Sequence, residues 1–91
     1  MATPQRQDSI SGSRRVLVSN AAANMIASLH PFDEVEADAT LETIRASVLD
    51  PAKVRKITGL DNAFVARAGD LRVVFRHEGD TIVITSVVAQ A

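Results

Sequence analysis

Apolar and polar residues alternate along the last third of the chain in a pattern typical of β-strands. Three short apolar runs lie between residues 62 and 88, separated by Ala68-Gly69-Asp70-Leu71 and by His77-Glu78-Gly79-Asp80-Thr81. Glycine beside aspartate supplies the positive φ angles that tight turns need. The pattern therefore predicts three antiparallel strands joined by two hairpin turns.

A two-residue loop at Gly69-Asp70 would fix the register of the first hairpin. One face of the sheet then pairs Arg67 with Arg72, Val65 with Val74 and Ala63 with Arg76. The other face carries Phe64, Ala66, Leu71, Val73 and Phe75. Like charges directly opposite each other destabilise a sheet, so the pairing of Arg67 with Arg72 is easier to understand if an anion binds this face. The register predicts one core face and one cationic face.

The upstream half of the chain has helical periodicity. Arg14 to Val18 is short and β-branched, which predicts a strand, and Ser19 is a good N-cap for a helix that ends at His30-Pro31. The apolar positions of this helix are Ala22, Met25, Ile26 and Leu29. A second helix is predicted from Phe32 to Leu49, with Val35, Leu41, Ile44 and Val48 facing inward and with Asp33, Glu34 and Glu36 in its first turn.

The order strand, helix, helix, strand, strand, strand predicts a small α+β domain. Its antiparallel sheet needs cover for Ile82, Ile84 and the apolar face of the first hairpin, and the two helices can supply this cover only from one side. We expect one domain over residues 14–91, because 91 residues hold a single modest core. Residues 1–13 contain one large apolar residue, Ile10, and are expected to be a disordered leader.

Composition narrows the classes of function. The chain has no cysteine, which excludes disulfides and thiolate chemistry. No apolar run approaches the ~20 residues of a membrane span, so we expect a cytoplasmic protein without a membrane partner. The acidic residues of 33–42 have no metal-ligand companions and no glycine-rich phosphate loop occurs, so neither a metal nor another cofactor is expected.

Charge is polarised along the chain although the net charge is only −1. Residues 33–50 hold six acidic side chains against Arg45, whereas residues 51–77 hold six basic side chains against Asp61 and Asp70. Only the second block can form an anion-binding surface. Within it, Lys53, Arg55 and Lys56 are expected in a loop before the sheet, where they either follow a phosphate backbone or form an ordinary solvated surface.

The two histidines have plainer interpretations than catalysis. Strand parity places His77 with Phe75 on the core-facing side at the start of a turn. His30 precedes a proline at a helix end, where an imidazole can interact with terminal carbonyl groups.

The same residues resemble the closing hairpins of the RelE/ParE toxin superfamily. There, a strand of the type aromatic-x-x-Arg runs through Gly-Asp into an arginine-bearing strand, as residues 64–76 do here, and an acidic turn leads into an aliphatic strand, as residues 77–84 do. Leu49-Asp50-Pro51 and Lys56-Ile57-Thr58-Gly59-Leu60 stand where the family usually has Leu-x-Asp-Pro and Lys-Leu-x-Gly-Leu. The likeness spans roughly residues 15–88, and it implies a RelE-like α+β fold with the first strand inserted into the sheet.

The resemblance also implies a function. Toxins of the RelE branch cleave messenger RNA on the ribosome without a metal, by attack of a 2′-hydroxyl on the adjacent phosphate. By this resemblance Arg67, Arg72 and Arg76 are the candidate catalytic residues, and the partners are a cognate antitoxin, the ribosome and mRNA. Lys53, Arg55 and Lys56 are the candidate nucleic-acid-binding residues.

The chain also departs from the nuclease pattern. Val65 and Leu71 replace a basic residue and a tyrosine, no tyrosine occurs anywhere, and the sequence stops at Ala91 where the family usually has a basic tail. Two alternatives therefore stay open: a ParE-like, non-catalytic inhibitor of DNA gyrase, and a degenerate RelE-fold protein that only binds an antitoxin.

Overall fold

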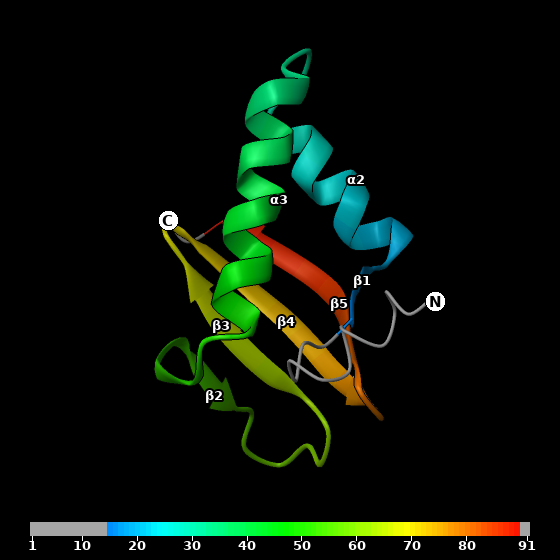
Figure 1. Cartoon of the computed structure of the whole chain (residues 1–91), viewed down its shortest axis with the longest axis vertical. Helices are drawn as coiled ribbons and strands as arrows, with labels where there is room; N and C mark the ends of the chain where they lie inside the picture. Colours follow the sequence, from blue (N-terminus) through cyan, green and yellow to red (C-terminus); the bar gives the residue numbers. More distant parts are fainter. Residues whose placement is uncertain (1–14, 90–91) are drawn as a thin grey trace, which may run out of the picture.

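A twisted sheet with two helices on one of its faces makes up the described part of the molecule, residues 15–89 of this computed structural model (Figure 1). The elements are β1 (Arg15–Val18), α2 (Asn20–Leu29), α3 (Glu34–Val48), the 3-10 helix η1 (Pro51–Lys53), β2 (Val54–Lys56), β3 (Phe64–Ala68), β4 (Leu71–Glu78) and β5 (Thr81–Ala89). The predicted α+β class with helices on one face is confirmed. The leader predicted over residues 1–13 lies outside the described residues.

The sheet differs from the prediction in two respects. Its order is β1-β5-β4-β3-β2, and β1 pairs in parallel with β5, so the sheet is mixed and β1 forms one edge. The prediction of a loop around Arg55 and Lys56 is wrong, because these residues belong to β2, which pairs with β3 and forms the other edge of the sheet. A strand of three residues is too short to show an alternating pattern, and only its pairing partner defines it.

Both hairpins have the predicted turns. Gly69 and Gly79 take φ angles of 63° and 64°, which glycine adopts without the strain that most other residues would incur, and Arg67 faces Arg72 across β3 and β4 as predicted. Farther along, Ser86 faces Val74 while Ile84 faces Phe75, so Thr85 is an extra residue in β5. This bulge brings Ile84 and Val87, three positions apart, to the same buried side of the sheet.

Each α-helix begins at a capping side chain, of which Ser19 was predicted and Asp33 was not. The Ser19 side chain accepts a hydrogen bond from the Ala22 amide at 3.1 Å, and the Asp33 side chain accepts one from the Glu36 amide at 3.0 Å. Because Asp33 is the cap, α3 begins at Glu34 and not at Phe32. The prediction that Val35 faces inward is wrong. Val35 is 80% exposed, because the first turn of α3 extends beyond the sheet (Figure 1).

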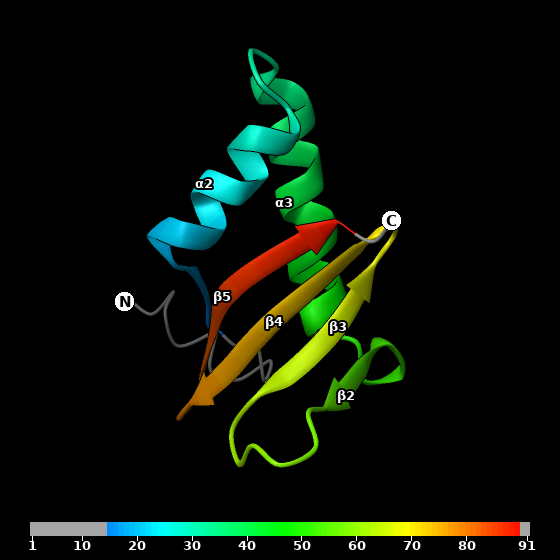
Figure 2. The same ribbon diagram turned by 180° about the vertical axis from the view of Figure 1, so that it is seen from behind.

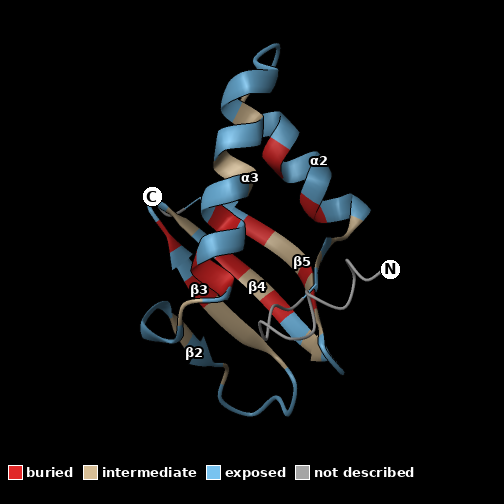
Figure 3. Ribbon diagram, viewed as in Figure 1, coloured by how far each residue is buried: buried red, intermediate tan, exposed pale blue. Residues whose placement is uncertain are grey.

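The core lies where the helices cross β3, β4 and β5 (Figure 3). Ala22 and Ile26 contribute from α2, and Ile44 and Val48 from α3, whereas Met25 and Leu29 stay 38% exposed at the margin. The sheet contributes Ala66, Ala68, Val73, Phe75, Ile82, Ile84 and Val87. Burying each large apolar side chain contributes roughly 1.5–3 kcal/mol, so this face of the sheet supplies most of the stability.

Candidate anion-binding site

Figure 2 shows the face of the sheet that the helices do not cover, and the strand register assigns the paired arginines Arg67 and Arg72 to this face. Cross-strand neighbours share a face, and the register places Arg55 beside Val65, Val65 beside Val74, and Arg67 beside Arg72. Their neighbours along the strands, Ala66 and Val73, are buried under the helices. The alternation of β2, β3 and β4 therefore directs three arginines to the open side.

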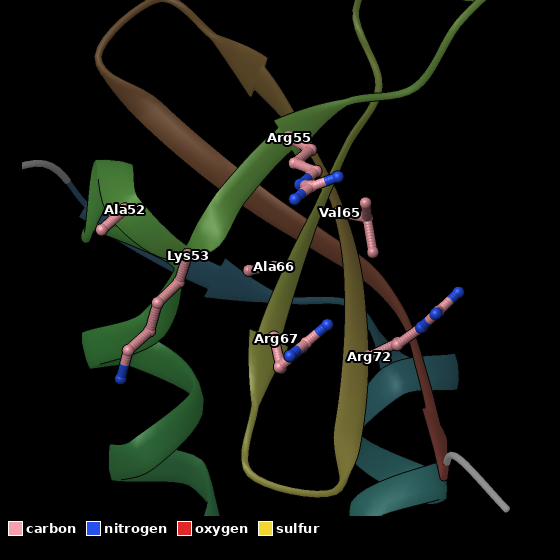
Figure 4. Close-up of a pocket in the computed structure, with 7 residues that line it drawn as sticks. All are labelled: Ala52, Lys53, Arg55, Val65, Ala66, Arg67 and Arg72. Carbon is pink, nitrogen blue, oxygen red and sulfur yellow. The ribbon is translucent and has the colours of Figure 1, made fainter.

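An open hollow of about 440 Å³ lies on this part of the molecule (Figure 4). Its lining residues are Ala52, Lys53, Arg55, Val65, Ala66, Arg67 and Arg72. The three arginines come from three neighbouring strands, and Lys53 stands at the margin on η1 (Figure 4). Every charged group that lines the hollow is a cation.

None of these cations is neutralised by a carboxylate within residues 15–89. The ion pairs of that range are Glu42 with Arg45 on α3 and Arg76 with Glu78 on β4. Four uncompensated positive charges on one concave surface attract anions. Guanidinium groups add bidentate geometry that suits the oxygens of a phosphate.

Four of the six predicted site residues line this hollow, and two do not. Arg76 lies on the same face, but its Nε donates to the Glu78 carboxylate and it does not line the hollow. Lys56 pairs with Phe64, which packs against the core on the helix side of the sheet. The strand β2 thus separates Arg55 and Lys56, which follow each other in sequence, onto opposite faces.

Neither histidine lines the hollow. The His77 ring lies tilted against Phe64 at a centroid distance of 4.7 Å and stacks on Phe75 at 5.8 Å, on the core-facing side as predicted. The side-chain amide of Asn62 makes two hydrogen bonds to the His77 backbone: its Nδ2 donates to the His77 carbonyl at 2.7 Å, and its Oδ1 accepts from the His77 N–H at 3.2 Å. This clamp was not predicted from the sequence. The His30 ring bonds the Thr40 hydroxyl at 2.8 Å and not the carbonyl groups of the helix end.

The lining residues limit the chemistry of the hollow. They can bind a phosphate and stabilise negative charge that develops on it. They include no carboxylate, histidine or tyrosine, and a guanidinium group stays protonated in proteins. No cluster of histidine and carboxylate side chains suited to a metal ion occurs in the described range. Among residues 15–89 no helix has the length and apolar character to cross a membrane.

The fold has clear counterparts among solved structures, although no protein-family model and no curated protein matches the sequence. The RelBE2 toxin–antitoxin complex of Mycobacterium tuberculosis aligns with a TM-score of 0.63 and 20% identity, over 85% of this chain and 98% of that one.

Two further solved structures have a similar fold. The YoeB dimer of Staphylococcus aureus aligns with a TM-score of 0.58 and 15% identity, over 86% of this chain and 98% of that one. The archaeal RelE–RelB complex of Pyrococcus horikoshii aligns with a TM-score of 0.58 and 18% identity, over 86% and 96% of the two chains. At these identities the likeness concerns the fold, and the chain therefore has the RelE-like toxin fold.

Proposed function

We propose that this protein is the toxin of a toxin–antitoxin module and that it inhibits translation in the cytoplasm by ribosome-dependent cleavage of mRNA. The observation that carries the proposal is the concave cluster of Lys53, Arg55, Arg67 and Arg72, which is uncompensated within the described residues and whose three arginines lie on the face opposite the helices. The fold supports it, because one of its counterparts is the RelBE2 toxin–antitoxin complex.

In this proposal the protein stabilises charge, and the RNA supplies the nucleophile. A 2′-hydroxyl attacks the adjacent phosphate, and the forks of Arg67 and Arg72 bind the oxygens of the phosphorane as their negative charge grows. Arg55 and Lys53 hold the flanking backbone, and Arg76 is a further contact on the same face once its bond to Glu78 exchanges for phosphate. The ribosomal site must then complete the proton transfers, because the lining residues offer no neutral-pH base.

The proposed antitoxin is a small protein with an acidic segment. Such a segment neutralises the hollow by charge complementarity and so prevents access of RNA. Two of the counterparts are complexes, the RelBE2 toxin–antitoxin complex and the archaeal RelE–RelB complex, and we extend that arrangement to this chain as part of the proposal.

A cell-free translation extract tests the proposal directly. Addition of the full chain should stall translation and produce mRNA cut within the reading frame, and the variant Arg67→Ala/Arg72→Ala should leave the message intact. Arg45→Ala is the matched control, because it removes an exposed arginine from α3 on the other side of the sheet. An extract that translates normally in the presence of folded protein contradicts the proposal.

Inhibition of DNA gyrase without catalysis is the second candidate. The observation that favours it is the composition of the hollow, which has cations but no histidine, tyrosine or carboxylate to move a proton. If this candidate holds, purified gyrase should lose supercoiling activity when the protein is added, and translation should continue. A protein that affects neither system and binds only an antitoxin is the degenerate member of the fold.

A further inference from the structure

The tip of the helical hairpin exposes apolar side chains that the fold leaves uncovered. Phe32, in the turn between α2 and α3, is 107% exposed, Val35 is 80% exposed and Leu29 is 38% exposed. The hairpin projects past the end of the sheet, so no described element packs on its tip (Figures 1 and 2). An aromatic and two aliphatic side chains gathered on a projecting tip are typical of an interaction surface.

The turn holds Phe32 in a specific conformation. Its φ angle of 66° lies in the left-handed region, which is unfavourable for a bulky residue and is seen where surrounding structure enforces it. The Asp33 amide donates to the His30 carbonyl at 3.2 Å, and the His30 ring bonds the Thr40 hydroxyl at 2.8 Å, which ties the turn to α3. The phenyl ring is therefore presented on an anchored turn.

Acidic side chains surround these apolar residues. Asp33, Glu34 and Glu36 are all exposed, and none has an ion pair within residues 15–89. This charge repels nucleic acids and anionic lipid surfaces. The occupant that complements the tip is instead a cationic surface with room for an apolar side chain.

The molecule itself carries such a surface. The hollow on the open face combines the cations of Lys53, Arg55, Arg67 and Arg72 with apolar lining from Ala52 and Val65, and its volume of about 440 Å³ suits a small organic group such as a phenyl ring. We propose that the hairpin tip of one copy docks into the cationic hollow of a second copy, with Phe32 against the apolar lining and the tip carboxylates against the arginines.

This contact has two consequences. It joins different surfaces of the two copies, so it is heterologous and leads to head-to-tail chains or closed rings. It also covers the residues to which we assign RNA binding, so self-association would mask the proposed toxin site at high protein concentration. The association itself does not depend on the proposed function.

Sedimentation velocity of the full chain at low and high salt tests the proposal. Wild-type protein should self-associate at low salt and dissociate as salt rises, because charge pairs at the rim are screened. Phe32→Asn should raise the dissociation constant on the order of ten- to a hundredfold, since it removes the apolar contact while asparagine tolerates the left-handed backbone. Arg67→Glu should have a comparable effect, because it reverses one charge in the hollow.

Mixing the two variants makes the test specific. Phe32→Asn keeps an intact hollow and Arg67→Glu keeps an intact tip, so each should be monomeric alone while an equimolar mixture forms a capped one-to-one dimer. Leu60→Asn is the control, because Leu60 is 54% exposed in the turn before β3 and belongs to neither surface; it should associate like wild type.

A wild-type protein that stays monomeric at low salt overturns the proposal, as does a mixture of the two variants that fails to associate. Self-association that persists in Phe32→Asn places the contact elsewhere and overturns it as well. The translation assay with dilute Phe32→Asn is independent: this variant should stay toxic if the proposed function is right, whether or not the protein self-associates.

Discussion

The two faces of the sheet are built from the same strands but carry different side chains, apolar and buried on one face and partly charged and exposed on the other. On the helix side, Val73, Phe75 and Ile84 are at most 1% exposed and pack against α2 and α3. On the open side the same strands present Arg67 and Arg72, which are exposed and face each other. Successive side chains of a β-strand point to opposite faces of the sheet. The side chains on the covered face therefore determine stability, whereas those on the open face are available for binding an anion.

The largest effect should come from Phe75 on the covered face. Phe75→Ala should lower the free energy of unfolding by about 3–5 kcal/mol, because it leaves a cavity under the helices. The neighbouring residue Val74 lies on the open face and is only half-buried, so Val74→Ala should cost about 1 kcal/mol or less. Chemical denaturation of the two variants measures the contrast, and equal losses would contradict the two-face description.

Replacing Asn62 should have a smaller effect on stability, which acts through the backbone of the sheet and so on both of its faces. Its amide makes two hydrogen bonds to the His77 backbone and so extends the pairing of β3 with β4 beyond Phe64. Asn62→Ala should lower the free energy of unfolding by about 1 kcal/mol, because water replaces these exposed bonds only in part. Hydrogen exchange at the His77 amide should quicken correspondingly, and an unchanged exchange rate would show that the clamp contributes nothing.

Arg55 and Lys56 offer a matched test of the open face. Arg55→Ala should weaken binding of a short single-stranded RNA roughly three- to tenfold and reduce the slope of log K against log salt by about 0.7, the expectation for one lost phosphate contact. Lys56→Ala should change neither quantity, since Lys56 pairs with Phe64 on the other side. Fluorescence anisotropy at several salt concentrations measures both; equal effects of the two variants would mean that the RNA does not discriminate between the faces.

The smallest effect should be a gain in stability at the hairpin tip. Phe32→Gly removes the strain of a φ angle of 66° and deletes a side chain that packs on nothing described. The free energy of unfolding should rise by up to about 1 kcal/mol, offset in part by the extra freedom of glycine in the unfolded chain. A thermal melt measures it, and a clear loss of stability would show that Phe32 packs within its own fold.

Much of the fold could be predicted because local chemistry specifies it. Gly69 and Gly79 define the turns, and once a turn is fixed the register and the facing of Arg67 and Arg72 follow. Ser19 caps α2 as predicted, whereas Asp33 was expected inside the first turn of α3 and is its N-cap. The two-helix cover follows from the apolar face that the hairpins must bury.

The remaining features depend on contacts between distant parts of the chain. The strand β2 exists only through its pairing with β3, and Val35 has an inward helical position but lies beyond the end of the sheet. The pairing of Arg76 with Glu78 is the exception: it is local, and strand parity could have predicted it, because residues two apart share a face. The hollow could not be derived from sequence, since it needs η1 and three strands to be placed together.

Arg72→Ala tests the central claim most directly, with the melting temperature and toxicity in cells measured on the same variant. Arg72 faces Arg67 across β3 and β4, so its removal relieves a like-charge pair and should leave stability within about 0.5–1 kcal/mol of wild type, or slightly above it. Loss of one preorganised donor to a developing phosphorane should lower the cleavage rate by about 10²–10³. Arg72→Ala should therefore give a folded, non-toxic protein; a variant that unfolds but stays toxic would show that Arg72 is a structural residue and not part of the site.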